Sequence, residues 1–206
     1  MIYFPLMKMK EIGMKSVLIV SGKGHAGHFL ELLGSGSEFG MSISYEVQEE
    51  AGGIAQALAL AEDFCGDEDL AVMLADNIFE DHLASSVKYF EESSDDAHVF
   101  LTHVKNPSSY GVAVFDEEKI IDIEEKPKNP QSNFAVTGFY LYKKNVFDVI
   151  RNLKPSARGE LEISDVNNYY IKAGKMGHTT LTGFWGDCGE SFDSLMEASK
   201  FIQNLK

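Results

Sequence analysis

Short apolar runs alternate with amphipathic stretches along the first half of the chain. The apolar runs that predict strands lie at residues 15–21, 42–47, 70–74 and 98–104. The stretches whose spacing or composition predicts helices lie between them, at residues 25–33, 54–64 and 83–90. Strands that alternate with helices are typical of an α/β fold, so we expect a mostly parallel sheet with helices on both faces.

The pattern changes after residue 104. Residues 110–115 and 119–123 flank Asp116-Glu117-Glu118 and predict a small β-hairpin added to the sheet. Further strands are predicted at residues 134–142 and 179–185, and further helices at residues 146–153, 163–173 and 191–205. No repeat or flexible linker interrupts this order, which predicts a single domain over residues 1–206.

Composition and charge narrow the classes of function. With 206 residues and 44% hydrophobic content, the chain is long enough to bury a core. Its 18 basic and 32 acidic residues give a net charge of -14, which argues against a general binder of nucleic acids or of membrane surfaces, since both favour Lys and Arg. Only two cysteines occur, and no apolar run approaches the roughly 20 residues that span a bilayer. We expect a cytoplasmic protein without a membrane segment.

Two acidic residues provide the clearest evidence of chemistry. Asp76, in Leu74-Ala75-Asp76-Asn77, and Asp187, in Trp185-Gly186-Asp187-Cys188-Gly189, each follow an apolar run. In open α/β sheets, ligands bind beyond the carboxyl ends of the strands, so these two side chains are expected to meet and hold one divalent ion. The alternative is that Asp76 caps a helix and Asp187 begins a turn.

Several segments, taken in order, resemble one enzyme family. They lie at residues 34–36, 48 with 52–57, 76–79, 110–112, 124–127, 135–138, 153–163 and 185–189. Their order and spacing are similar to those of the sugar-phosphate nucleotidylyltransferases, in particular the glucose-1-phosphate thymidylyltransferase group. Because the likeness runs along essentially the whole chain, it is more specific than any single motif.

The resemblance implies a fold, a reaction and a cofactor. The fold is the Rossmann-like sheet of nucleotide-diphospho-sugar transferases. The reaction joins a nucleoside triphosphate, dTTP or UTP, to glucose 1-phosphate, giving dTDP-glucose (or its uridine counterpart) and pyrophosphate. The cofactor is Mg²⁺, and Asp76 and Asp187 match the family's magnesium ligands, which suits a hard cation that prefers carboxylate oxygens.

The resemblance also assigns binding residues. Gln48 and Gly53 match the positions that contact the nucleotide base; otherwise they are a polar strand end and a helix-entry turn. The residues that match the sugar-phosphate pocket are Tyr110, Gly111, Glu125, Lys126, Val136 and Arg158. Of these, Glu125 is suited to accept hydrogen bonds from sugar hydroxyls, and Lys126 and Arg158 to bind phosphate. Without the family resemblance, Glu124-Glu125-Lys126 would be a solvated charged turn, and Arg158 an exposed arginine before a helix.

The family pattern begins with a strand and a glycine-rich loop that carries an arginine and a lysine, whereas this chain begins just after them. Backbone N–H groups and cations of such a loop bind the triphosphate, so we expect little or no activity from these residues alone. Two further hypotheses stay open: a noncatalytic protein that binds a sugar phosphate or nucleotide sugar, and one half of a split enzyme.

The same comparison predicts unpaired strand edges. The family's first strand lies inside the sheet, so we expect two open edges and an exposed apolar trench that begins at Leu6, Met9 and Ile12. Open edges pair readily with another chain. We therefore expect a homo-oligomer that covers the gap, or neighbouring strands that close over it.

Overall fold

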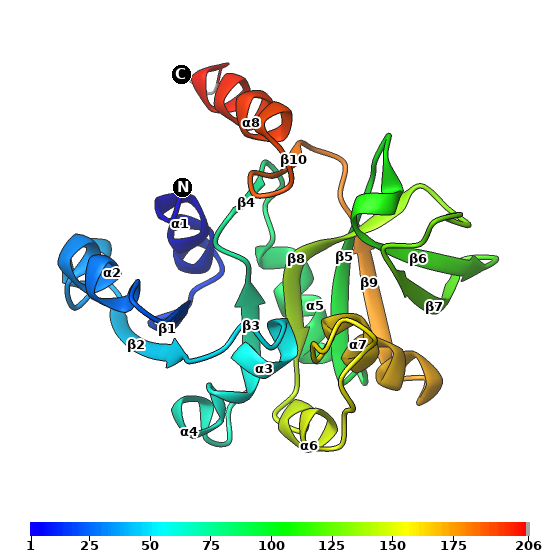
Figure 1. Cartoon of the computed structure of the whole chain (residues 1–206), viewed down its shortest axis with the longest axis horizontal. Helices are drawn as coiled ribbons and strands as arrows, with labels where there is room; N and C mark the ends of the chain where they lie inside the picture. Colours follow the sequence, from blue (N-terminus) through cyan, green and yellow to red (C-terminus); the bar gives the residue numbers. More distant parts are fainter. Residues whose placement is uncertain (205–206) are drawn as a thin grey trace.

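The computed structural model describes residues 1–204 (Figure 1). Its strands are β1 (Ser16–Gly22), β2 (Ser42–Gln48), β3 (Leu70–Met73), β4 (Asn77–Phe79), β5 (Ala97–His103), β6 (Gly111–Asp116), β7 (Lys119–Glu125), β8 (Phe134–Tyr142), β9 (Met176–Thr180) and β10 (Trp185–Asp187). Its helices are α1 (Tyr3–Glu11), α2 (Ala26–Leu33), α3 (Ile54–Ala59), α4 (Glu62–Cys65), α5 (Ala84–Glu92), α6 (Val146–Arg151), α7 (Ile163–Lys172) and α8 (Phe192–Asn204), with short 3-10 helices at Ser37–Phe39 and Pro107–Ser109. Among residues 1–204, no helix has both the length and the apolar character needed to cross a membrane.

The main sheet is mixed. Its order is β7-β6-β8-β5-β9, with β3 on β8 as well. The parallel ladders are β1 with β2 and β5 with β9, whereas β8 runs antiparallel to β3, β5 and β6. The expected α/β class is confirmed, but the prediction of a mostly parallel sheet is wrong. Sequence order suggests that successive strands are neighbours, yet β8, which comes late in the chain, lies between β3 and β5.

Helices cover both faces of this sheet, as predicted. Alternate side chains of β5 enter different cores: Val99 and Leu101 pack with α6 and α7, whereas Phe100 packs with α5. All three side chains are fully buried. A run of consecutive apolar residues, such as Val99, Phe100 and Leu101, is typical of a strand covered on both faces, and helices pack on each side of β5.

The hairpin is confirmed, and two element boundaries need correction. Strands β6 and β7 pair antiparallel, from Gly111 with Glu125 to Asp116 with Lys119. The helix predicted at 54–64 is divided into α3 and α4 near Leu60. The strand predicted at 179–185 ends at Thr180 in β9, and the chain then turns at Gly183 before it forms β10. This break matters because β10 leaves the main sheet and pairs antiparallel with β4.

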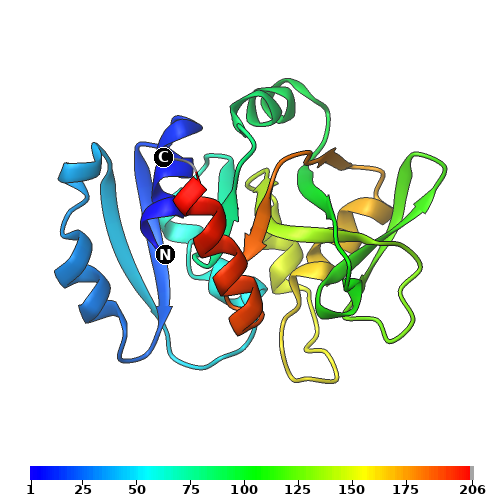
Figure 2. The same cartoon turned by 90° about the horizontal axis from the view of Figure 1, so that it is seen from above.

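Strands β1 and β2 form a separate ribbon at one end of the molecule, opposite the β6–β7 hairpin (Figure 2). In the part of the chain described, β1 is paired only with β2, and β3 only with β8. The prediction of two open edges is therefore confirmed, and neighbouring strands have not closed over them. The prediction of an exposed trench at Leu6 and Met9 is wrong, because both side chains are buried where α1 packs against two of the cores.

Candidate active site

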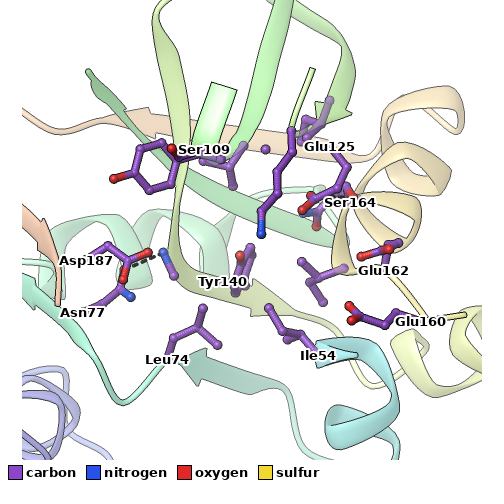
Figure 3. A pocket seen from close by; sticks show the side chains of 18 of the residues that line it. Ile54, Leu74, Asn77, Ser109, Glu125, Tyr140, Glu160, Glu162, Ser164 and Asp187 are labelled. Atoms are coloured by element: carbon purple, nitrogen blue, oxygen red, sulfur yellow. Dashed lines mark hydrogen bonds between the residues drawn. The ribbon is translucent and has the colours of Figure 1, made fainter. Parts of the chain in front are cut away.

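A cavity of about 320 Å³ lies where β8, the start of the hairpin and the loop before α7 meet. Its lining includes Tyr110, Gly111, Glu125, Lys126, Val136, Tyr140, Arg158, Glu160, Glu162, Ser164, Trp185 and Asp187. Figure 3 shows Asp187 and Asn77 on one side, Glu125, Ser164, Glu162 and Glu160 on the other, and Tyr140 between them. Every predicted sugar-phosphate residue thus borders the same space as one of the predicted metal ligands.

The carboxylates of Asp76 and Asp187 converge. A Cβ atom placed on Gly189 would lie 2.4 Å from Asp76 Oδ2 and 3.4 Å from Asp187 Oδ1, so both oxygens approach the same point. The Cys188 N–H donates to the Asp76 carbonyl oxygen at 2.9 Å. Burial, followed by the nearby charge of Asp76, raises the pKa of Asp187. Two partly buried carboxylates side by side repel each other, and a divalent cation would relieve that repulsion.

The way these two residues meet differs from the prediction. Asp76 precedes β4 and Asp187 ends β10, and the antiparallel pairing of these three-residue strands sets Asn77 opposite Asp187. A small ribbon off the main sheet therefore brings the two acids together, rather than the parallel carboxyl ends of neighbouring strands in one sheet. The predicted proximity was right although its structural basis was not.

An arginine and several carboxylates form the other side of the cavity. Arg158 donates from Nε to Glu162 Oε1 at 3.0 Å and from Nη2 to Glu162 Oε2 at 2.7 Å. The same Nη2 lies 3.4 Å from Glu125 Oε1 and 3.5 Å from Glu160 Oε2. Ser164 donates to the other oxygen of Glu125 at 3.0 Å. Arg158 is thus held in place by Glu162 while its outer face borders the cavity.

Lys126 and Tyr110 lie at the junction between the hairpin and the cavity. Lys126 has a φ of 45°, a left-handed conformation that non-glycine residues seldom adopt, and its N–H donates to the Tyr110 carbonyl oxygen at 3.0 Å. Such conformations persist where the surrounding structure holds them, often at binding sites. The Tyr110 ring packs edge-on against Trp185, with 5.2 Å between ring centroids. Burial and the nearby acids Glu190 and Asp187 raise the pKa of Tyr110 to about 12.

The predicted nucleotide residues lie beside the cavity rather than on its lining. Gln48 donates from Nε2 to the Gly53 carbonyl oxygen at 3.1 Å and to Gln56 Oε1 at 2.7 Å. Gly53 has a φ of 96°, and a Cβ there would lie 2.5 Å from the Leu161 carbonyl oxygen. Two backbone hydrogen bonds, from Leu161 to Gly52 and from Ala55 to Leu161, fasten this segment to the loop that carries Arg158.

Sequence reasoning missed several residues of the site. Tyr140 is buried at the cavity floor, where burial and then the charges of Glu125, Asp187 and Asp76 raise its pKa. Its signal was available, because it lies at an even spacing from Val136 on the same strand and so faces the same side. Glu162 belonged to a matched segment but was given no role, and nothing in the sequence indicates that it pairs with Arg158.

Comparison with known proteins places this chain in a family. The nucleotidyl transferase family model matches residues 1–204. The chain is 41% identical over 210 residues to the glucose-1-phosphate thymidylyltransferase of Mycolicibacterium smegmatis, covering all of this chain and 72% of the relative. The chain belongs to the nucleotidyl transferase family. The Neisseria meningitidis glucose-1-phosphate thymidylyltransferase is also 41% identical to this nucleotidyl transferase, which covers 73% of it.

Solved structures agree with this assignment. A Bacillus anthracis protein described as a glucose-1-phosphate thymidylyltransferase, solved in complex with sucrose, superposes with a TM-score of 0.92 at 47% identity, covering 97% of this chain and 81% of that one. A UDP-glucose pyrophosphorylase complexed with UDP-glucose has a TM-score of 0.83 at 24% identity, covering 98% and 86% of the two chains, which supports the fold alone. The nucleotide-diphospho-sugar transferase fold predicted for this nucleotidyl transferase is therefore confirmed.

Proposed function

We propose that this nucleotidyl transferase chain carries the sugar-phosphate pocket and the metal-binding carboxylates of a glucose-1-phosphate thymidylyltransferase. In that reaction an oxygen of the phosphate of glucose 1-phosphate attacks the α-phosphorus of dTTP or UTP, the bond to the β-phosphate breaks, and pyrophosphate leaves. One observation carries the proposal: a single cavity has Asp187, whose carboxylate converges with that of Asp76, on one side and Lys126 with Arg158 on the other.

The sugar-phosphate side has groups for both parts of its substrate. Glu125, with one oxygen near Arg158 and the other accepting from Ser164, is placed to accept hydrogen bonds from sugar hydroxyls. Lys126 and Arg158 bind the phosphate, since among the described residues that line the cavity these two are the cations of Lys or Arg type. Tyr110 and Val136 form apolar walls that orient the sugar ring.

The opposite side positions the nucleotide. Asp76 and Asp187 would hold Mg²⁺, which would supply positive charge to neutralise the phosphates. The Gln48 amide oxygen accepts a hydrogen bond from the pyrimidine N3–H, because the amide nitrogen already donates to Gly53 and Gln56. Gly53 leaves the base room beside the backbone. Bringing two polyanions together is the main barrier, so positioning and charge neutralisation account for most of the catalysis.

Titration calorimetry with glucose 1-phosphate tests the pocket. We expect binding to the unaltered chain, and binding about tenfold or more weaker to Lys126→Gln, because a charge-assisted contact to phosphate is lost. Lys128→Gln is the matched control, since this lysine lies two residues further along the same loop and outside the cavity lining. Equal affinity of Lys126→Gln and the unaltered chain for glucose 1-phosphate would refute the assigned pocket.

A second candidate function is binding of a sugar phosphate or nucleotide sugar without transfer. It is favoured by the distribution of charge, because Lys126 and Arg158 both lie on the sugar side, whereas the triphosphate side presents Asp76 and Asp187. Pyrophosphate release from dTTP, glucose 1-phosphate and Mg²⁺ distinguishes the two. Release at ordinary enzyme rates supports transfer, whereas calorimetric binding without release supports the second function. Activity that appears only when a second polypeptide is added supports a split enzyme.

A further inference from the structure

Asn77 lies at the centre of a buried hydrogen-bond network beside Asp76. Its side chain is 1% exposed. Oδ1 accepts from the Gly138 N–H of β8 at 2.9 Å and from the Trp185 indole N–H of β10 at 2.8 Å. Nδ2 donates to Asp76 Oδ1 at 2.9 Å. One amide therefore connects the main sheet, the β4–β10 ribbon and one of the two convergent carboxylates.

The two donors fix the orientation of this amide. A flipped Asn77 would turn its NH₂ group toward two N–H donors, leaving both buried donors without an acceptor, which is energetically costly. The orientation with Oδ1 toward Gly138 and Trp185 is thus the stable one, and it directs the NH₂ group at Asp76. Space is equally restricted, since a Cβ on Gly138 would lie 2.7 Å from both Cγ and Oδ1 of Asn77.

We propose that Asn77 is a positioning residue for the metal site, a role that rests on the proposed function of Asp76 and Asp187. By donating to Asp76 Oδ1, it restricts rotation of the carboxylate and directs Oδ2 toward Gly189 and Asp187. Residues that hydrogen-bond to metal ligands set their orientation, and their loss commonly weakens metal binding 10- to 100-fold. The fixed amide of Asn77 is the means by which β8 and β10 hold the carboxylate ready for the cation.

The test measures Mn²⁺ affinity from the electron paramagnetic resonance signal of free Mn²⁺, without reliance on turnover. We expect Asn77→Ser to bind Mn²⁺ about tenfold or more weakly than the unaltered chain. Asn168→Ser is the control: this asparagine makes two hydrogen bonds to the backbone of Ile123 on β7, away from Asp76. It is expected to lower stability and leave Mn²⁺ affinity unchanged.

A second variant covers the case in which Asn77→Ser does not fold. Gly138→Ala retains Asn77 and Asp76 but places a methyl group against the amide, so it displaces the amide and is also expected to weaken Mn²⁺ binding. Trp185 is the only tryptophan in the sequence, and its fluorescence emission is expected to shift in both variants before metal is added. Its indole N–H loses the Asn77 acceptor in Asn77→Ser, and in Gly138→Ala that acceptor is displaced.

The outcomes separate this inference from the proposed function. If Asp76→Asn binds Mn²⁺ as tightly as the unaltered chain, or if the unaltered chain binds none, the metal assignment fails and the role of Asn77 fails with it. If Asp76→Asn loses binding while folded Asn77→Ser and Gly138→Ala keep it, the metal site stands and the positioning role is overturned. A parallel loss in all three supports both.

Discussion

At the scale of single residues, the site depends on buried acids that hold other groups in place. Glu162 shows this most clearly: its side chain is 9% exposed, it accepts two hydrogen bonds from Arg158, and it accepts a third from Ser156 at 2.6 Å. A carboxylate satisfied in this way stays ionised and fixes the arginine geometry. Glu162 therefore acts on the cavity indirectly, by holding the guanidinium of Arg158 in one orientation.

Glu162 is expected to contribute stability in a pH-dependent way. Its hydrogen bond with Arg158 lowers its pKa, so the ionised form is favoured in the folded state. The stabilisation is complete above the ordinary glutamate pKa of about 4.3 and is lost as pH falls through the lowered native value. Glu162→Gln should therefore lower the free energy of unfolding by about 1–3 kcal/mol at pH 7. The loss should become smaller as the pH falls below the ordinary glutamate pKa.

Urea unfolding at neutral and at acid pH measures this difference. Glu160→Gln is the matched control, because Glu160 approaches the same guanidinium only at 3.5 Å and is more exposed, so its loss should change stability little at either pH. If Glu162→Gln lowers the free energy of unfolding by the same amount at both pH values, the ionised pair of Glu162 and Arg158 is contradicted.

At the scale of elements, the sequence was most informative for the longer strands and least informative where strands of three residues pair. The hairpin and β8 follow from alternation and length, whereas the contribution of Tyr110, Glu125 and Val136 to one cavity followed from the family resemblance. The β4–β10 ribbon does not follow, since strands of three residues carry too little periodicity to be recognised. That ribbon brings Asp76 to Asp187, so the expected position of both acids at strand ends predicted their proximity on a structural basis that the fold does not have.

The contact between the segment at 52–55 and Leu161 also escaped prediction, and it supports a testable expectation. Gly53→Ala combines a left-handed backbone position, which costs a non-glycine residue about 1–3 kcal/mol, with a collision against the Leu161 carbonyl oxygen. Gly13→Ala is the control, because Gly13 has a φ of 89° with nothing within 4 Å of an added Cβ. In urea unfolding, Gly53→Ala should lose clearly more stability than Gly13→Ala. Equal losses would mean that the loop moves freely away from Gly53.

At the scale of the whole molecule, β1 and β3 belong to one layer without being bonded to each other. Val17 packs on the same core as Ala71 and Met73, and Leu18 on the same core as Leu70 and Val72, so the two strands present matching faces. Their other edges are paired, β1 to β2 and β3 to β8. The side chains of β3 are all only partly buried, unlike those of β5. The apolar residues of β3 and β5 predict burial for both of these strands. Within residues 1–204, however, β3 is paired on one edge only, and its side chains stay partly buried.

These open edges lead to the prediction that the chain associates with itself in solution. Unpaired N–H and C=O groups on apolar strands favour pairing with another chain, and net charge of -14 opposes it only weakly at physiological salt, where the screening length is about 8 Å. Light scattering after size exclusion should give a mass that is a multiple of 22.8 kDa.

In hydrogen exchange, the β1 and β3 amides that face the open edges should be protected in the oligomer and lose that protection on dilution. The amides of β5, which is paired with β8 on one side and with β9 on the other, serve as the reference because their protection should not depend on concentration. A monomer whose β1 and β3 edges exchange rapidly at every concentration would contradict self-association, and would leave those edges available to a different polypeptide.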